Sequence, residues 1–422
     1  MIAVVGSVTA LLLAVSILLT GHGLQLTVAP LYAMELGWSS DTIGWTGSAY
    51  FLGFVLGCLT IPRLVSGVGH IRVFSTLVCV ATCALLLLGL FPVFGAWLIA
   101  RLATGWAFAG LYMVIESWLN ERTTPENRGT VLSLYATLTL VAITLGQFAT
   151  SLPLTSLQFI LLGAAILVLG AVPVGLTRTP APAEIPAVGF EFRAVFRASQ
   201  VAIAAAFAGG LVTSGFWTLG PVVASQSLGA GQAGYFMAIT LLGGAVIQLP
   251  VGRLSDHIDR RWVLLGLALA GITVCAATTL LGPGDSVMYF ALMFLFGGCM
   301  FPMYAISLAH ANDHTRLPLI ETGSVILLVH SAGSIAGPVV MSSLLSVTAY
   351  GMQIFGAGVF LVFAGWAAVR IFRHPVDRPY FEPFQEVPKT SHEFMEIVSD
   401  LPADGEAFPS TGATADLNSG SA

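Results

Sequence analysis

Ionisable and polar side chains are rare inside the long apolar stretches of this sequence, so those that occur there are the first candidates for chemistry. His22 stands shortly before Gln25, Arg101 and Glu116 share a later stretch, and His330 lies in another. Histidine gains and loses a proton near neutral pH, and a guanidinium in an apolar stretch is costly unless it faces water or a charged partner. His22, Glu116 and His330 are therefore candidates for proton coupling. Arg101 is expected to pair with an acid or an anionic solute, or to bias a proton site.

Each of these residues also has a structural interpretation. A lone histidine can hydrogen-bond to a backbone carbonyl in a packed interface, and Arg101 can extend its side chain to the outer membrane interface beside a structural partner. Glu116 stands near the end of its stretch, where it can equally belong to an ion-pair network with Arg63, Arg72 or Arg122. The sequence alone leaves these alternatives open.

The composition indicates a protein whose main solvent is lipid. Of the 422 residues, 56% are hydrophobic and only 9% are charged, which leaves too little polar surface for a water-soluble fold. About 20 apolar residues in a helix cross a bilayer core of about 30 Å, and backbone groups in hydrocarbon must be satisfied within the segment. The sequence predicts an all-α integral membrane protein with twelve spans, at 6–33, 42–65, 73–94, 97–119, 129–151, 157–176, 199–225, 232–251, 262–282, 286–309, 323–346 and 352–372.

Signals of enzyme or metal chemistry are missing from the sequence. The five cysteines all lie inside predicted spans, without a disulfide framework or a zinc-binding spacing, so we expect them to be packing residues. Paired carboxylates, a nucleophile elbow, a metal-ligand cluster and a phosphate-binding loop are not evident. The sequence predicts no enzyme activity, no cofactor and no metal site.

The positive charges predict the orientation of the chain. Of the sixteen basic residues, Arg101 alone lies well inside a span. The others flank or occupy the even-numbered gaps, or mark the end of the last span: Arg63, Arg72, Arg122, Arg128, Arg178, Arg193, Arg197, Arg253, Arg260, Arg261, Arg316, Arg370, Arg373, Arg378 and Lys389. Because Lys and Arg are retained on the cytoplasmic side during insertion, we expect a multi-pass protein of the inner membrane with both termini in the cytoplasm.

The sequence also repeats itself once. The landmarks Gly44, Gly53 and Arg63 recur 190 residues later as Gly234, Gly243 and Arg253. Gly105, Tyr112 and Asn120 recur 192 residues later as Gly297, Tyr304 and Asn312. The repeat predicts two six-helix halves, 1–176 and 199–372, joined by a cytoplasmic linker, 177–198, and followed by an acidic tail, 373–422, that is too polar to form a core.

Four stretches resemble known transporter motifs. The stretch that contains Gly252, Asp256, Arg260 and Arg261 resembles the cytoplasmic loop signature of the major facilitator superfamily, with Asp259 where the signature has its second glycine. Arg101 and Gly105 resemble an Arg-x-x-x-Gly pattern of that superfamily. The stretches 116–129 and 304–313 resemble its YcaD-like branch. In the first half the loop signature is degraded, with proline at 62 and serine at 66 in its first glycine and acidic positions.

The resemblance implies which residues work in transport. In this superfamily spans 1, 4, 7 and 10 line a central cavity, which nominates as solute contacts His22, Gln25, Arg101, Tyr112, Trp217 and Tyr304. It also implies a cytoplasmic gate formed by Gly252, Asp256, Arg260 and Arg261 with Arg63 of the first half. The gate residues could instead be a solvated charged turn that only sets orientation.

The function expected from these observations is secondary active transport by alternating access. The expected solute is a small organic molecule, vitamin-like or nutrient-like, with an aromatic solute among the options, and protons are the expected coupling ion. A multidrug or metabolite exporter and a transporter-like sensor that does not move solute are the alternatives. The expected partners are the solute, protons and the lipid bilayer, without nucleic acid, and the expected state is a monomer.

Overall fold

The chain folds into a bundle of membrane-spanning helices. The structure, a computed structural model, describes residues 2–122, 125–176, 191–284 and 286–373. Within these ranges every regular element is a helix, and twelve spans are long and apolar enough to cross a membrane, as the sequence predicts. The predicted tail beyond residue 373 and most of the predicted linker lie outside the described residues.

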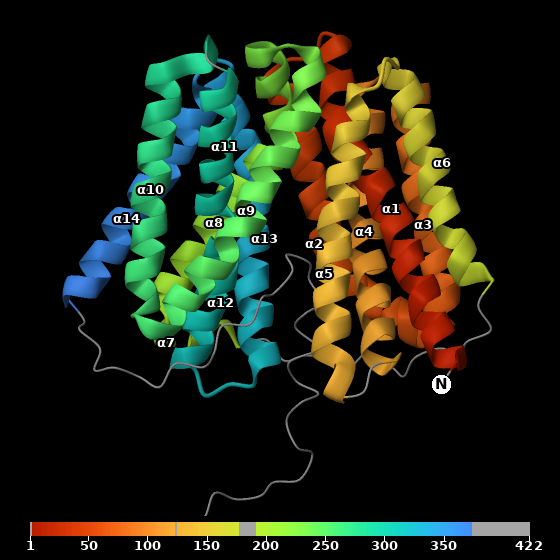
Figure 1. Cartoon of the computed structure of the whole chain (residues 1–422), viewed down its shortest axis with the longest axis horizontal. Helices are drawn as coiled ribbons and strands as arrows, with labels where there is room; N and C mark the ends of the chain where they lie inside the picture. The colour runs from red at the N-terminus through yellow and green to blue at the C-terminus, as the bar shows by residue number, and fades with distance from the viewer. Residues whose placement is uncertain (1, 123–124, 177–190, 285, 374–422) are drawn as a thin grey trace, which may run out of the picture.

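Among the described residues, six α-helices form the N-terminal half and seven form the C-terminal half (Figure 1). The N-terminal half comprises α1 (Ile2–Glu35), α2 (Ser40–Val68), α3 (His70–Leu90), α4 (Phe94–Arg122), α5 (Pro125–Phe148) and α6 (Ser156–Gly175). The C-terminal half comprises α8 (Gln200–Leu228), α9 (Ala233–His257), α10 (Arg260–Leu281), α11 (Ser286–Met300), α12 (Pro302–His314), α13 (Leu319–Leu345) and α14 (Gly351–Arg373). A short helix that the sequence analysis did not anticipate, α7 (Phe192–Ala198), precedes α8.

The tenth span is broken in the middle. It was expected as one helix over 286–309, but it consists of α11 and α12, with Phe301 between them. Pro302 has no N–H to bond and its ring clashes with the carbonyl of the residue four positions before it, so a continuous helix ends there. The two helices still form one span from Ser286 to His314.

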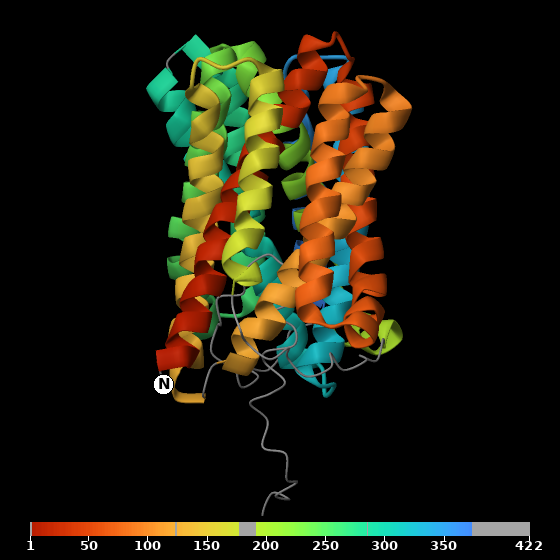
Figure 2. The ribbon, with the colours of Figure 1, turned by 90° about the vertical axis from the view of Figure 1, so that its right-hand side faces the viewer.

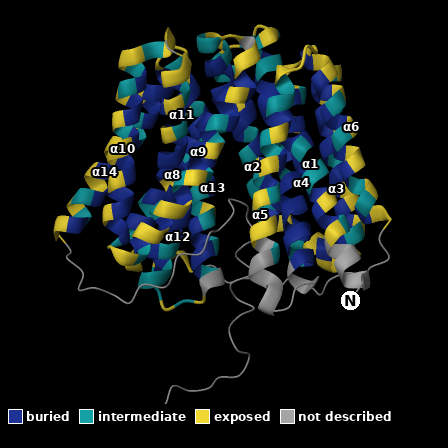
Figure 3. Ribbon diagram, in the orientation of Figure 1, coloured by how far each residue is buried: buried dark blue, intermediate teal, exposed yellow. Residues whose placement is uncertain are grey.

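The burial of the spans is unequal and matches the expected arrangement. In spans 1, 4, 7 and 10, which contain α1, α4, α8 and the α11–α12 pair, 72% to 83% of the most apolar window is buried. In the other eight spans the buried share is 22% to 50%, because one face of each helix is left for lipid (Figure 3). The four spans that the resemblance assigns to the centre are therefore the most enclosed.

Glycines let the helices within each half approach to backbone contact. A Cβ added at Gly53 would meet the backbone oxygen of Leu102, and one added at Gly105 would meet the backbone oxygen of Tyr50. These contacts hold α2 against α4. Because small residues permit such close packing in membranes, the glycines of the sequence repeat mark helix contacts.

The same contacts recur in the second half. Gly243 lies against the backbone oxygen of Phe294, and Gly297 lies against that of Thr240. They hold α9 against α11 in the way that α2 is held against α4.

The two halves meet at one end of the bundle (Figure 1). The N-terminus lies at the other end (Figures 1 and 2). Gly44 of α2 lies against Ser342 of α13, and the Ser346 hydroxyl donates a hydrogen bond of 2.7 Å to Asp41. We call this the opposite end. The other end, where α2 turns into α3 and α9 into α10, carries Arg63, Arg72, Arg253, Arg261 and Arg316, and we call it the basic end.

Further contacts between the halves lie at the opposite end. Gly234, near the start of α9, packs against Gln147 at the end of α5, and the rings of Phe148 and Tyr235 lie 5.3 Å apart. The Ser48 hydroxyl donates a 2.6 Å hydrogen bond to the backbone oxygen of Ile335. Helix α2 thus packs against α13, and α5 packs against α9. The repeated glycines Gly44 and Gly234 each lie in one of these two contacts between the halves.

We predict that Gly53→Leu destabilises the protein by about 1–3 kcal/mol, because the new side chain must push α2 away from α4. The measurement is thermal unfolding of the purified protein in detergent. Gly266→Leu is the matched control, because Gly266 has open space around its Cβ position. Equal melting temperatures for the two variants would contradict the packing argument.

Candidate functional site

A group of polar and aromatic side chains lies between α1, α2 and α4. The side chains of His22, Gln25, Tyr50, Arg101 and Tyr112 are all buried. The Gln25 amide nitrogen donates to His22 Nδ1 at 2.9 Å, and the Tyr50 hydroxyl lies 3.4 Å from His22 Nε2. Since an amide nitrogen only donates, Nδ1 is an acceptor and the proton of the neutral ring lies on Nε2.

Aromatic rings fix the position of this histidine. The His22 ring stacks on Phe108 with a centroid separation of 3.7 Å, and it meets Tyr112 edge-on at 6.4 Å. Phe108 and Tyr112 lie one turn apart on α4, so the same helix that carries Arg101 also forms one wall for His22. We call His22, Gln25, Tyr50, Arg101, Phe108 and Tyr112 the N-half cluster.

Arg101 is held inside the protein over an aromatic ring. Its guanidinium carbon lies 4.7 Å from the centroid of Tyr50, in cation–π geometry, and only 6% of its surface is exposed. Among the described residues, its Nη1 has no hydrogen-bond partner, and no carboxylate lies within ion-pair distance of the side chain. The cluster therefore presents a positive charge whose Nη1 is not hydrogen-bonded by the part of the chain that the structure describes.

Glu116 lies outside this cluster, further along α4. Its side chain is buried, and its Oε1 accepts a 3.0 Å hydrogen bond from the hydroxyl of Tyr135 on α5. The sequence offered proton coupling or an ion pair with Arg63, Arg72 or Arg122 for this residue. The observed Tyr135 bond was not anticipated, and it shows that Glu116 connects α4 to α5.

The candidates of the C-terminal half form separate contacts. The ring of Tyr304 lies 4.9 Å from that of His330, whose Nδ1 donates to the backbone oxygen of Ala206 at 3.1 Å. This is the carbonyl bond that the structural interpretation of a membrane histidine describes. Trp217 instead packs against Phe301, with ring centroids 6.0 Å apart.

The residues of the predicted gate form ion pairs at the basic end. Arg260 is 1% exposed, and its Nε donates to Asp313 at 2.7 Å while its Nη2 lies 3.6 Å from Asp256. These bonds join α9, α10 and α12 within the C-terminal half, close to Gly252, which is buried near the end of α9. Arg63, the expected partner in the first half, is exposed on α2.

Asp259 organises the start of α10. It caps the helix by accepting from the backbone N–H of Arg261 at 2.9 Å, and its carboxylate pairs with the Arg261 guanidinium at 2.6 Å. Burial acts to raise the pKa of Asp259, but the hydrogen bonds and charge of Arg261 outweigh it and hold the pKa below its usual value. Asp259 thus stays ionised at neutral pH and keeps Arg261 in place.

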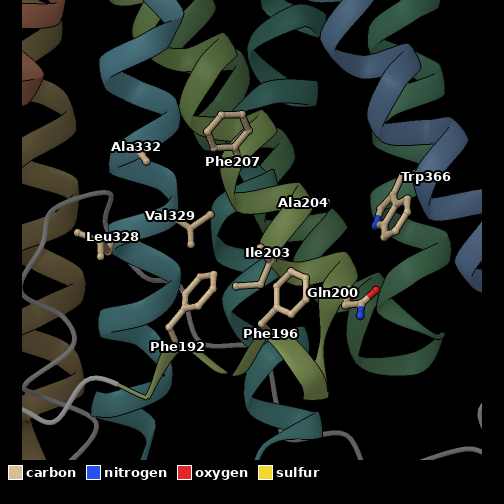
Figure 4. A pocket seen from close by; sticks show the side chains of 10 residues that line it. All are labelled: Phe192, Phe196, Gln200, Ile203, Ala204, Phe207, Leu328, Val329, Ala332 and Trp366. Atoms are coloured by element: carbon tan, nitrogen blue, oxygen red, sulfur yellow. The ribbon is translucent and has the colours of Figure 1, made fainter. Parts of the chain in front are cut away.

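A separate apolar groove lies at the surface of the C-terminal half (Figure 4). Its volume is about 490 Å³, and its lining includes Phe192 and Phe196 of α7, Phe207 of α8, Leu328 of α13 and Trp366 of α14. Its lining contains no charged side chain and none of the predicted site residues. The groove suits a lipid chain better than a polar solute.

The twelve-span helical fold is that of a membrane transporter, and the comparisons with known proteins agree with this class. The family model of the Major Facilitator Superfamily matches residues 11–340, so this chain belongs to that superfamily. It is 26% identical over 322 residues to the uncharacterized MFS-type transporter YcaD of Escherichia fergusonii, covering 74% of this chain and 82% of the relative. It is 28% identical over 321 residues to an uncharacterized MFS-type transporter of Enterobacter sp. strain 638, with the same coverage.

Solved structures show the same fold. The nucleoside transporter NupG superposes with a TM-score of 0.70 at 16% identity, covering 88% of this chain and 98% of that one. A bacterial homolog of the human lysosomal transporter Spinster, inward-facing and unoccupied, superposes with a TM-score of 0.69 at 17% identity, covering 89% and 99%. These likenesses confirm the expected fold. The family model and the sequence relatives confirm the expected superfamily and its YcaD-like branch.

We predict that Arg260→Met destabilises the protein by about 3–5 kcal/mol, because it removes the guanidinium that pairs with the buried Asp313 carboxylate. Replacing both residues, as Arg260→Met with Asp313→Leu, should recover most of this loss. The measurement is thermal unfolding in detergent, and Arg63→Met is the control, since an exposed arginine contributes little. A double variant as unstable as the single one would contradict the pairing argument.

Proposed function

We propose that this protein is a secondary active transporter that moves a small organic solute with an anionic group across the inner membrane by proton-coupled alternating access. The observation that carries the proposal is the buried Arg101 guanidinium over Tyr50, with Nη1 unbonded among the described residues. A vitamin-like or nutrient-like carboxylate with an aromatic part would suit the charge and the rings of the N-half cluster.

The charge of Arg101 favours an anion over a purely structural role. If the side chain extended to the membrane interface, its guanidinium would be exposed. Only 6% of the surface of Arg101 is exposed, so the side chain stays inside the protein. A buried, unpaired charge is strongly unfavourable unless something compensates it. The Tyr50 ring supplies part of that compensation, and a carboxylate or phosphate on the solute would supply the rest.

His22 is the proposed site of proton coupling. Protonation at Nδ1 would turn this nitrogen into a donor. It could then no longer accept the hydrogen bond that the Gln25 amide nitrogen donates to it. The Gln25 Oε1 has no hydrogen-bond partner among the described residues, so rotation of the amide would present an acceptor instead. A second positive charge beside Arg101 is costly, and an anion bound at Arg101 would lower this cost, which links solute binding to proton uptake.

The proposed transport cycle rocks the two halves about this cluster. The basic end is proposed to face the cytoplasm, in keeping with the distribution of arginine. With the halves joined at the opposite end, through Gly44, Gly234 and the Asp41–Ser346 bond, we take this conformation to be inward-facing. Trp217 and Tyr304 are the proposed solute contacts of the second half, and the gate of Gly252, Asp256, Arg260 and Arg261 with Arg63 is proposed to close the basic end.

We predict that purified protein in proteoliposomes moves protons when one member of a panel of vitamins, nucleobases, organic acids and dyes is added. Internal pH is the readout, and the sign of the change distinguishes symport from antiport. Accumulation of the compound would distinguish a transporter from a sensor. Ligand-induced thermal stabilisation without any flux would contradict the proposal and favour the sensor.

We further predict that Arg101→Ala lowers transport of that compound by about 100-fold, since a charge-assisted hydrogen bond to a buried anion contributes up to about 3 kcal/mol. His22→Gln should bind the compound but lose proton coupling. Arg72→Ala is the control, because Arg72 is exposed at the basic end. Normal uptake by a well-expressed Arg101→Ala protein would exclude Arg101 from the solute site.

A further inference from the structure

Three potential metal ligands gather in the last turn of α12. His310, Asp313 and His314 lie on one face of the helix, at positions i, i+3 and i+4. One ligand atom from each residue lies within 4.8 Å of the other two. In a tetrahedral zinc site the ligand atoms are roughly 3.4 Å apart, given metal bonds of about 2.1 Å. The three ligand atoms would have to draw closer together than their 4.8 Å limit to reach that spacing.

The hydrogen bonds leave metal-binding nitrogens on both histidines. His314 Nδ1 lies 2.9 Å from the backbone oxygen of His310. A carbonyl can only accept, so Nδ1 carries the proton and Nε2 carries the lone pair, which is the arrangement that orients a metal-binding imidazole. His310 is 3% exposed, and its Nδ1 has no hydrogen-bond partner among the described residues. A buried ring nitrogen without a partner is costly, and a metal ion would satisfy it.

The charges around the two histidines also accommodate a cation. Asp313 accepts a 2.7 Å bond from Arg260, and hydrogen-bonded carboxylates are usual among metal ligands. Arg260 also approaches Asp256, and Arg261 is paired with Asp259. In these ion pairs three carboxylates face two guanidinium groups.

We propose that His310, Asp313 and His314 form a binding site for a divalent transition-metal ion of the zinc type at the basic end of α12. Two imidazoles and one carboxylate select zinc, cobalt or nickel over magnesium or calcium, which prefer oxygen ligands. Three protein ligands leave at least one position for water or another ligand. No metal site was predicted from the sequence, because residues 304–313 stood out only as a segment that resembles the YcaD-like branch, and this segment ends before His314.

The site would connect metal occupancy to the gate. The metal would share the Asp313 carboxylate with Arg260, the residue that joins α10 to α12 and to Asp256. Binding of the ion would therefore draw electron density from the oxygen atoms that hold Arg260. The proposed ligands lie in the second half, away from the N-half cluster, so this inference stands independently of which solute is transported.

The test is isothermal titration of the full-length, tag-free protein in detergent with zinc chloride. We expect one zinc ion per chain in the wild type. His314→Ala and His310→Ala should each weaken binding at least tenfold. His257→Ala is the matched control, since His257 is exposed at the end of α9, at the same end of the bundle; its affinity should equal that of the wild type.

Cobalt serves as a spectroscopic probe of the same ligands. Bound Co²⁺ should show the visible absorption of a low-symmetry nitrogen and oxygen site in the wild type and in His257→Ala, and this absorption should be lost in His314→Ala. If His310→Ala fails to fold, the half-buried His314 decides the matter. Absence of zinc binding to the wild type, or equal affinity in His314→Ala and His257→Ala, would overturn the proposal.

Discussion

The close contact between α2 and α4 is the constraint on which the candidate transport site depends. Gly105 lies against the backbone oxygen of Tyr50, and Gly53 lies against that of Leu102, the neighbour of Arg101. One contact thus involves Tyr50 itself, and the other involves the residue next to Arg101. Together they bring the Arg101 guanidinium over the Tyr50 ring inside the bundle. A larger residue at either glycine would separate the helices, and with them the pair.

The second half keeps this scaffold and changes its chemistry. Gly243 and Gly297 make the equivalent contacts between α9 and α11, but Thr240 stands at the position that corresponds to Tyr50, and Met293 at the one that corresponds to Arg101. The ionic contacts of the second half lie instead at the basic end, around Arg260. The sequence repeat thus produces two halves with similar helix packing. In our proposal the first half supplies most of the solute contacts and the second half carries most of the gate.

The features that the membrane environment imposes on the chain were predicted from the sequence. The twelve spans and the glycine landmarks follow from length, polarity and periodicity. The sequence also singled out His22 and Arg101, because each has a polar group in an apolar setting, and the family resemblance added Gln25 and Tyr112. The structure brings these four residues together. Tyr50 was missed, since an aromatic residue in a span looks like packing until a distant helix is brought against it. The same reason explains why the Tyr135 bond and the Asp313 partner of Arg260 were not anticipated. The break before Pro302 has a local cause, the ring and the missing N–H of the proline.

Alternating access requires the halves to separate at the end where they now meet, and a reversible cross-link there tests this most directly. Asp41 and Ser346 face each other across the halves through a 2.7 Å hydrogen bond, so Asp41→Cys with Ser346→Cys, in a chain without its five native cysteines, can form a disulfide. The account predicts that oxidation stops solute flux in proteoliposomes and that a reductant restores it, while the single Asp41→Cys variant is unaffected. Unchanged flux in a fully cross-linked protein would contradict the account.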